Sequence, residues 1–511
     1  MGSGNRHVEV EKKFDVPAGT VFPSFDGLAA VARVEPQPAQ SLDAVYFDTP
    51  GRDLSAHRIT LRRRTGGPDA GWHLKLPAGP DARTEVHAPL DTSPEADDSA
   101  VPTDLLDIVL AIVRDRPLAP VARISTTRNV VMLYGGDGSA LAEFCDDEVS
   151  AWALGSADGE AGDEQRWHEW ELELVDGEID GGRELLQRLG NRLLDAGAVP
   201  AGHGSKLAKV LDTAGSLPGA PEESQEPEES EDVSSDPVHQ AVAEQVDELL
   251  VWDRAVRADT YDSVHQMRVT TRKIRSLLQA SEDSFGLTDD AWVLDELRQL
   301  AGVLGIARDA EVLAERYETT LKDLPDELIR GPVYERLVDG AQRSYQAGLR
   351  RSLTAMRSTR YFRLLDALEE LVATRPPEAA PGEEPKPVTI DSAYKKVQKA
   401  AKNAAEATEH RDEALHRIRK GAKRLRYVAA ATGEPKVSDR AKTIQTLLGD
   451  HQDSTVSRAH LVQQSLVAHA AGEDTFTYGL LYQLEDDLAN RCREQLEDAL
   501  SALRKTFKKA H

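Results

Sequence analysis

Two strand-like segments of this sequence gather carboxylates on one side of an extended chain. In HVEVEKKF, the alternation of strand side chains puts Glu9, Glu11 and Lys13 on one face. In HEWELEL, the same alternation aligns three glutamates, Glu169, Glu171 and Glu173. Carboxylates that face a common space repel one another unless a divalent cation lies among them. The chemistry that these segments indicate is therefore metal binding.

Basic residues come from other segments of the same region. They are Arg62 and Arg64 in LRRR, Lys75 in HLKLP, Arg83 in RTEVH, Arg128 in STTRNVV and Lys206 in GSKLAK. Acids on one side of a site and bases on the other predict a metal ion together with a bound phosphate. The alternative for each strand taken alone is an ordinary sheet face that is polar toward solvent.

A different pattern of bases occurs in the second half of the chain. In HQMRVTTRKIR, the spacing i, i+3, i+7, i+10 keeps four bases within about an 80° arc of a helix. These bases are His265, Arg268, Arg272 and Arg275. The pattern returns 151 residues later in LHRIRKGAKRLR, as His416, Arg419, Lys423 and Arg426. Two related helical halves would explain this repeat.

A row of guanidinium groups suits an anion that repeats its charge along its length, because each forked donor can bind phosphate oxygens. The alternative is a solvated helix face whose bases pair with the chain's own carboxylates. Nucleic acid is less favoured, because no aromatic residues alternate with the bases to stack on nucleotide bases. We therefore expect a phosphate polymer at these helices.

The spacing of apolar residues predicts the elements that position these residues. Up to residue 212 the alternating segments predict an antiparallel sheet, with helical patches at 103–113 and 182–196. Residues 213–237 are acidic and poor in apolar residues, which predicts a flexible linker. From 238 to 511 the period is helical, and a Pro-rich break at 373–388 separates the halves 238–372 and 389–511. The fold class expected is α+β with two domains.

Composition narrows the class of partner. The 511 residues include 88 Asp and Glu against 62 Lys and Arg, a formal net charge of -26, which argues against coating nucleic acid or a membrane through bulk charge. The two cysteines, Cys145 and Cys492, have no metal-ligand spacing and suit a reducing compartment. No segment resembles a signal peptide or a membrane span. We expect a cytoplasmic protein, with association with polyphosphate granules left open.

The ordered series ExExK, LRRR, LKLP, RTE, ExExE and GSK resembles the CYTH family, also called triphosphate tunnel metalloenzymes, over residues 5–212. This resemblance implies an eight-stranded antiparallel tunnel that holds a triphosphate with Mg²⁺ or Mn²⁺. The implied metal ligands are Glu9, Glu11, Glu169, Glu171 and Asp146, where CDDEV leaves Glu148 as the alternative to Asp146. The last two glutamates would also orient the attacking water. The implied phosphate ligands are Lys13, Arg62, Arg64, Lys75, Arg83, Arg128 and Lys206.

The two basic helices, with LGIARD at 304–309 and LGDHQD at 448–453, resemble the CHAD domain over residues 238–511. This resemblance implies two pseudo-symmetric four-helix bundles that bind inorganic polyphosphate at the repeated basic positions. Together the two resemblances predict metal-dependent hydrolysis of inorganic triphosphate or short polyphosphate by a polyphosphate-binding protein. Two alternatives stay open: a scaffold that binds polyphosphate without catalysis, and an enzyme for an organic triphosphate, such as a thiamine triphosphatase or an adenylate cyclase.

Overall fold

The computed structural model describes residues 6–213, 237–373 and 390–510, apart from 26, 29, 80–81, 92–99, 156–161, 178–180, 281–284, 286–290, 407–410 and 432. Nearly all of the predicted linker and of the predicted Pro-rich break lie outside these described residues.

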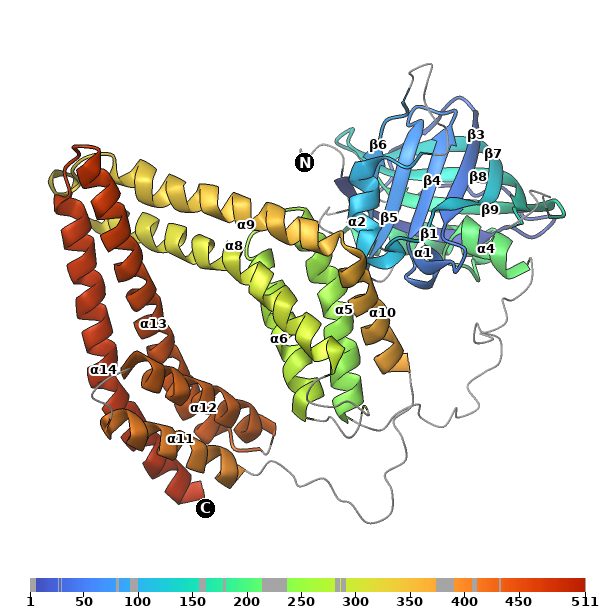
Figure 1. The fold of residues 1–511 in the computed structure, drawn as a ribbon. Coiled ribbons are helices and arrows are strands. Elements are labelled where there is room, and N and C mark those ends of the chain that lie inside the picture. Colours follow the sequence, from blue (N-terminus) through green and yellow to red (C-terminus); the bar gives the residue numbers. More distant parts are fainter. Residues whose placement is uncertain are drawn as a thin grey trace, which may run out of the picture. The chain divides into compact units, whose positions relative to one another are not determined.

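The first part of the chain forms an antiparallel sheet (Figure 1). Its strands are β1 (Arg6–Asp15), β2 (Arg33–Pro36), β3 (Gln40–Asp48), β4 (Thr60–Thr65), β5 (Gly71–Gly79), β6 (Ala82–Ala88), β7 (Ala119–Tyr134), β8 (Ala140–Ala153), β9 (Gln165–Leu174) and β10 (Val199–Pro200). Eight of them close into a tunnel in the order β1-β6-β5-β4-β3-β7-β8-β9, because β1 pairs with β6 over its first residues and with β9 over its last. The predicted eight-stranded antiparallel tunnel is confirmed.

Apolar side chains on the outer face of the tunnel strands are covered by short helices. These helices are α1 (Asp53–Ala56), α2 (Thr103–Val113) and α3 (Gly182–Asp195). A fourth helix, α4 (Lys206–Thr213), packs its apolar residues against inward-facing residues of β3, β7 and β8. On α3, Leu186 and Leu189 pack in one cluster with Phe14 and Trp170 of the sheet. Because the outer face is apolar and covered, the alternating inner face is left to line the interior, where polar residues surround the space that α4 does not fill.

The rest of the chain is helical (Figure 1). Its elements are α5 (Pro237–Arg257), α6 (Ser263–Ala280), α8 (Trp292–Asp323), η2 (Asp326–Leu328), η3 (Glu335–Asp339), α9 (Gly340–Met356), α10 (Thr359–Ala373), α11 (Ile390–Glu406), α12 (Arg411–Ala431), α13 (Pro435–Ala470) and α14 (Phe476–Ala510). The all-helical class predicted for this part is confirmed. In the later half α11 to α14 make four helices, whereas the earlier half ends in two shorter helices, α9 and α10.

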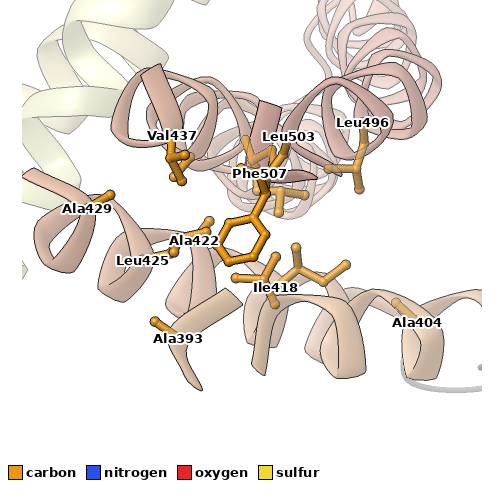
Figure 2. Packing of buried hydrophobic residues seen from close by; sticks show 14 of the residues in the cluster. Ala393, Ala404, Ile418, Ala422, Leu425, Ala429, Val437, Leu496, Leu503 and Phe507 are labelled. Atoms are coloured by element: carbon orange, nitrogen blue, oxygen red, sulfur yellow. The ribbon is translucent and has the colours of Figure 1, made fainter. Parts of the chain in front are cut away.

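The four helices of the later half share one apolar core. Figure 2 shows residues of these helices pointing toward one another around the ring of Phe507, which stacks on Tyr394 with ring centroids 3.8 Å apart. Gly421 allows α12 to approach α11 closely, because a Cβ atom there would lie 3.2 Å from Cγ2 of Val397. The core therefore fixes which faces of α11 and α12 are left to solvent.

The chain divides into two compact units: Met1–Thr270 with Leu353–Arg375, and Thr271–Ser352 with Pro376–His511. The first unit thus contains α5 and α10 together with the tunnel. Within it, Arg114 at the end of α2 forms ion pairs with Asp366 and Glu369 of α10. Asp107 of α2 accepts a hydrogen bond from Arg357 at 2.5 Å. Within the described residues, no helix is both long and apolar enough to cross a membrane.

Candidate functional site

A cavity of about 790 Å³ lies inside the tunnel and is lined mainly by charged side chains. All seven bases expected at the tunnel site line it: Lys13, Arg62, Arg64, Lys75, Arg83, Arg128 and Lys206. They come from five strands and the start of α4, so residues far apart in the sequence meet because the sheet closes. Such a concentration of cations in a partly buried space favours a small, highly charged anion.

Strand β1 supplies one wall of this cavity through alternate residues. Glu9, Glu11 and Lys13 all line it, as the strand alternation predicts. Lys75 of β5 donates to Glu9 at 2.6 Å, and Lys13 donates to Glu11 at 2.8 Å. Acids and bases therefore alternate along the wall.

A second set of charges lies where β7, β8 and β9 meet the start of α4. Lys206 lies 3.0 Å from Asp147, 2.5 Å from Glu169 and 2.8 Å from Glu171. Arg128 binds Asp147 through two nitrogens, at 2.8 and 2.7 Å, and Glu171 at 2.5 Å. We call Asp147, Glu169 and Glu171 the inner carboxylates.

The cations around the inner carboxylates keep Glu171 ionised. Burial alone would raise the pKa of Glu171, but Lys13, Lys206 and Arg128 hold it well below the ordinary value of 4.5. A carboxylate with so low a pKa accepts hydrogen bonds from water without readily taking its proton. Glu171 is therefore suited to orienting a water molecule.

A further group of possible metal ligands consists of His7, Glu9 and Glu173, whose ligand atoms lie within 4.8 Å of one another. Burial, and next the neighbouring carboxylate of Glu9, raise the pKa of Glu173 to about 8. Among the described residues, Glu173 forms no ion pair. We call His7, Glu9 and Glu173 the His7 group.

Both groups offer hard oxygen ligands, as Mg²⁺ and Mn²⁺ require. The inner carboxylates are already neutralised by three cations of the protein, Lys13, Arg128 and Lys206. In the His7 group, by contrast, the one lysine or arginine in contact within the described residues is Lys75, which lies 2.6 Å from Glu9. A divalent cation would relieve more repulsion at the His7 group, and Glu11 and Glu171 lie on the same cavity wall. The residues present therefore fit a metal ion near Glu9 and Glu173.

Asp146 does not face the cavity. Its carboxylate accepts a hydrogen bond from Nε1 of Trp170 at 2.7 Å and contacts His168, on the outer face of the sheet. The neighbouring Asp147 points inward and is fully buried. Asp146 and its alternative Glu148 share the outward parity of β8, so the inward acid of CDDEV is Asp147. Glu169 also does not line the cavity, whereas Glu173 does.

Other residues of the cavity were not predicted from the sequence. Glu85 of β6 is buried, and His73 lies 2.9 Å from one of its oxygens. Tyr46 of β3 lines the cavity and accepts a hydrogen bond from Arg62 at 3.4 Å. Glu85 could have been found from its spacing to Arg83, because residues two apart on a strand share a face. Tyr46 carries no comparable signal.

The basic positions of the helical part lie on α6 and α12. On α6, Met267, Ile274 and Leu278 are fully buried, while Arg272 is exposed and the other three bases are half-buried. The basic arc therefore borders the packed face, as the helical spacing predicts.

On α12 the bases form a row along α13. His416 lies 3.0 Å from Gln452, and Arg426 donates to Gln445 at 3.4 Å. Between them, Arg419 comes so close to the backbone of α13 that a Cβ atom at Gly449 would lie 3.2 Å from its Nη2. We call His416, Arg419, Lys423 and Arg426 the α12 stripe. The partners of His416 and Arg426 are neutral, whereas Arg419 lies near the carboxyl of Asp453 on α13 and opposes the rise that burial causes in its pKa.

Two family models match the chain. The CYTH domain model matches residues 7–194, and the CHAD domain model matches residues 240–462. Two uncharacterized proteins from two strains of Mycobacterium tuberculosis are each 65% identical to the chain over 517 residues, covering 99% of the chain and 98% of their own length.

Several solved structures resemble parts of the chain. PptA from Streptomyces chartreusis is 20% identical with a TM-score of 0.43, covering 52% of this chain and 98% of its own. The CHAD domain from the plant Ricinus communis is 21% identical with a TM-score of 0.40, covering 52% and 90%. A putative adenylyl cyclase from Hippeastrum, described as having a dominant triphosphatase activity, is 18% identical with a TM-score of 0.26, covering 41% and 98%.

Proposed function

The chain belongs to the proteins that join a CYTH domain to a CHAD domain, and from this premise we propose that it hydrolyses inorganic triphosphate or short polyphosphate and binds longer polyphosphate. The observation that carries the proposal is the cavity of about 790 Å³, which combines seven bases with carboxylates suited to a metal ion. Binding of a phosphate chain accounts for the seven bases. Hydrolysis accounts for the carboxylates, which would hold the metal ion and orient the water.

In this proposal the bases hold the substrate by its charge. Arg62, Arg64 and Arg128 offer forked donors to phosphate oxygens, while Lys75 and Lys206 act as compact charges. Burial, and next the neighbouring Arg62 and Arg128, lower the pKa of Arg64, so an anion among these guanidinium groups relieves their repulsion. The cavity therefore has its positive charge in place before the substrate arrives.

The reaction needs placement and charge more than covalent chemistry. A bound Mg²⁺ or Mn²⁺ supplies neutralisation of the charge on the phosphate oxygens. Glu9 and Glu173 would hold it, with Glu11 and Glu171 nearby on the same wall. Glu171, ionised by its three cations, would orient the water that attacks the terminal phosphorus. The bond from the terminal phosphorus to its bridging oxygen breaks, and the shortened chain leaves with the electron pair on that oxygen. One proton of the water stays on the released phosphate, and the other passes to the shortened chain or to solvent.

The test is phosphate release by the full chain, with Mg²⁺ or Mn²⁺, from triphosphate, long-chain polyphosphate, ATP and thiamine triphosphate. The informative variant is Glu9→Gln with Glu11→Gln, and the matched control is Glu148→Gln, which changes an exposed carboxylate on the outer face of β8. We expect metal-dependent turnover of triphosphate that the double variant loses and the control keeps.

Other outcomes would change the proposal in defined ways. Turnover of ATP or thiamine triphosphate alone would replace the inorganic substrate with an organic one. No turnover of any substrate, with polyphosphate binding retained, would leave a binding protein without catalysis.

A further inference from the structure

Seven cations form a band on the side of α11 and α12 that faces away from their shared core. We call them the outer band: Lys395, Lys396, Lys399, Lys402, Arg417, Lys420 and Arg424. All seven are exposed. None of them belongs to the α12 stripe or to the cavity of the tunnel.

Helix geometry makes this band continuous. On α11 the buried Ala393 and Val397 occupy one face, and Lys395, Lys399 and Lys402 lie on the opposite face within about a 60° arc. Figure 2 shows Ala393 and Ala404 on the core side of this helix. The three cations that α12 contributes share its outward arc, and the close approach at Gly421 brings the two helices side by side.

The outer band also adjoins the α12 stripe. Arg419 of the stripe is followed directly by Lys420 of the band. In the same way, Lys423 of the stripe is followed by Arg424 of the band. Consecutive residues lie about 100° apart around a helix. A flexible anion can therefore pass from the stripe over the outward side of α12 onto α11.

These cations have few partners within the chain. Among the described residues, only Lys402 has an ion pair, at 3.9 Å to the exposed Glu406. Two exposed cations elsewhere in the helical part have acidic partners: Arg298 pairs with Asp295, and Lys322 pairs with Glu318. In a chain with a net charge of -26, so many exposed cations without carboxylates favour a partner from outside.

Packing does not require lysines at these positions. The offset of 151 residues aligns α11 with α5, so that the buried Ala393 and Val397 correspond to the buried Val242 and Val246. Two lysine positions of α11 carry the opposite charge on α5, where one side chain is exposed and the other half-buried. Lys395 and Lys399 correspond to Glu244 and Glu248. The equivalent helix thus packs with acids where α11 has bases, so packing alone does not require the lysines.

We propose that the outer band is a second binding surface for long-chain polyphosphate, which extends the α12 stripe across α12 and α11. This inference rests on the proposed binding of polyphosphate by the helical part. Long chains contact both surfaces, whereas triphosphate is too short to span them. One exposed aromatic ring, Tyr427 of α12, adjoins the band, and Arg426 of the α12 stripe lies over it at 5.6 Å. A single ring offers no series of platforms on which successive bases could stack, which favours polyphosphate over single-stranded nucleic acid. The surface therefore selects for chain length.

The test compares the full chain with the variant Lys395→Gln, Lys399→Gln, Lys402→Gln. The matched control is Arg298→Gln, Lys322→Gln, Arg343→Gln, which removes the same charge from cations with partners inside the chain. Affinities for long-chain polyphosphate and for triphosphate are measured over a range of salt, with helicity checked by circular dichroism. We expect the variant to bind long chains roughly tenfold more weakly, with a salt slope smaller by about 2, as for lost phosphate contacts in single strands. Affinity for triphosphate stays unchanged.

The outcomes separate this inference from the proposal beneath it. If the variant, the control and the original chain bind long polyphosphate with equal affinity, the outer band is not a binding surface. Polyphosphate binding by the rest of the helical part would still stand. Failure of the original chain to bind polyphosphate at all overturns the proposed function of the helical part. Tighter binding of single-stranded DNA than of polyphosphate at equal salt, lost in the same variant, reassigns the band to nucleic acid.

Discussion

Glu173 provides a quantitative test of the reasoning about the cavity. Burial, and next the carboxylate of Glu9, raise its pKa from the ordinary 4.5 to about 8. Between these two values the folded chain keeps a proton that the unfolded chain has lost, so the stability of the metal-free protein should fall as pH rises from about 4.5 to 8. The change Glu173→Gln removes this carboxylate and with it the part of the pH dependence that Glu173 causes.

The size of the effect follows from the pKa. At pH 7 the group lies 2.5 pH units above its ordinary pKa of 4.5, and each unit corresponds to about 1.4 kcal/mol, so the upper bound is about 3 kcal/mol. Rearrangement of neighbours reduces this, and we expect Glu173→Gln to stabilise the metal-free protein by about 1 to 3 kcal/mol. Each kcal/mol raises the melting temperature by roughly 2 to 4 °C for a domain of about 200 residues.

The assay is calorimetric unfolding of the full chain in a chelator at pH 5, 7 and 8.5, repeated with Mn²⁺. The variant should melt higher than the original chain at pH 7 and 8.5, with the smallest difference at pH 5. Added Mn²⁺ should stabilise the original chain more than the variant, because the cation compensates the carboxylate of Glu173. Glu148→Gln should behave like the original chain throughout. Equal melting of Glu173→Gln and the original chain at all three pH values would refute the electrostatic account of the His7 group.

Three further changes test other parts of the structure. Lys206→Met should destabilise the tunnel by about 3 to 5 kcal/mol in calorimetry, because it leaves the inner carboxylates without a central cation; unchanged stability would show that Arg128 and Lys13 suffice. Arg419→Gln with Arg426→Gln should weaken polyphosphate binding several-fold in a titration while triphosphate hydrolysis continues, and parallel loss of both would contradict separate sites. Gly421→Leu should destabilise the later helical half by about 1 to 3 kcal/mol in chemical denaturation, because its side chain would meet Val397; a neutral result would show that α11 can shift.

Strand alternation predicted much of the cavity. Glu9, Glu11 and Lys13 share a face because of their spacing alone, and each predicted base reaches the interior. Alternation could also have separated Asp147 from Asp146, since the buried Phe144 marks the outward parity of β8. The choice between neighbouring acids requires knowing which face of the strand is covered.

Which carboxylates form ion pairs could not be predicted from the sequence. Glu169 and Glu171 look alike in HEWELEL, yet Glu169 is buried against Lys206 and Trp167 away from the cavity, while Glu171 lines it. The closure of β9 onto β1 and the arrival of α4 decide this difference, and both involve residues distant in sequence. In the helical part, the repeat predicted the basic positions, but the exposed lysines of α11 have no counterpart in the first half.

The ion pairs between α2 and α10 bear on how the polypeptide would behave if it were cut. A fragment ending at residue 213 would keep Arg114, which is buried, but would lose Asp366 and Glu369 that neutralise it. A fragment beginning at residue 237 would present those acids, with Arg357 ready to meet Asp107. The two fragments are therefore expected to associate in trans, and cleavage would remove their high effective concentration without removing their mutual affinity.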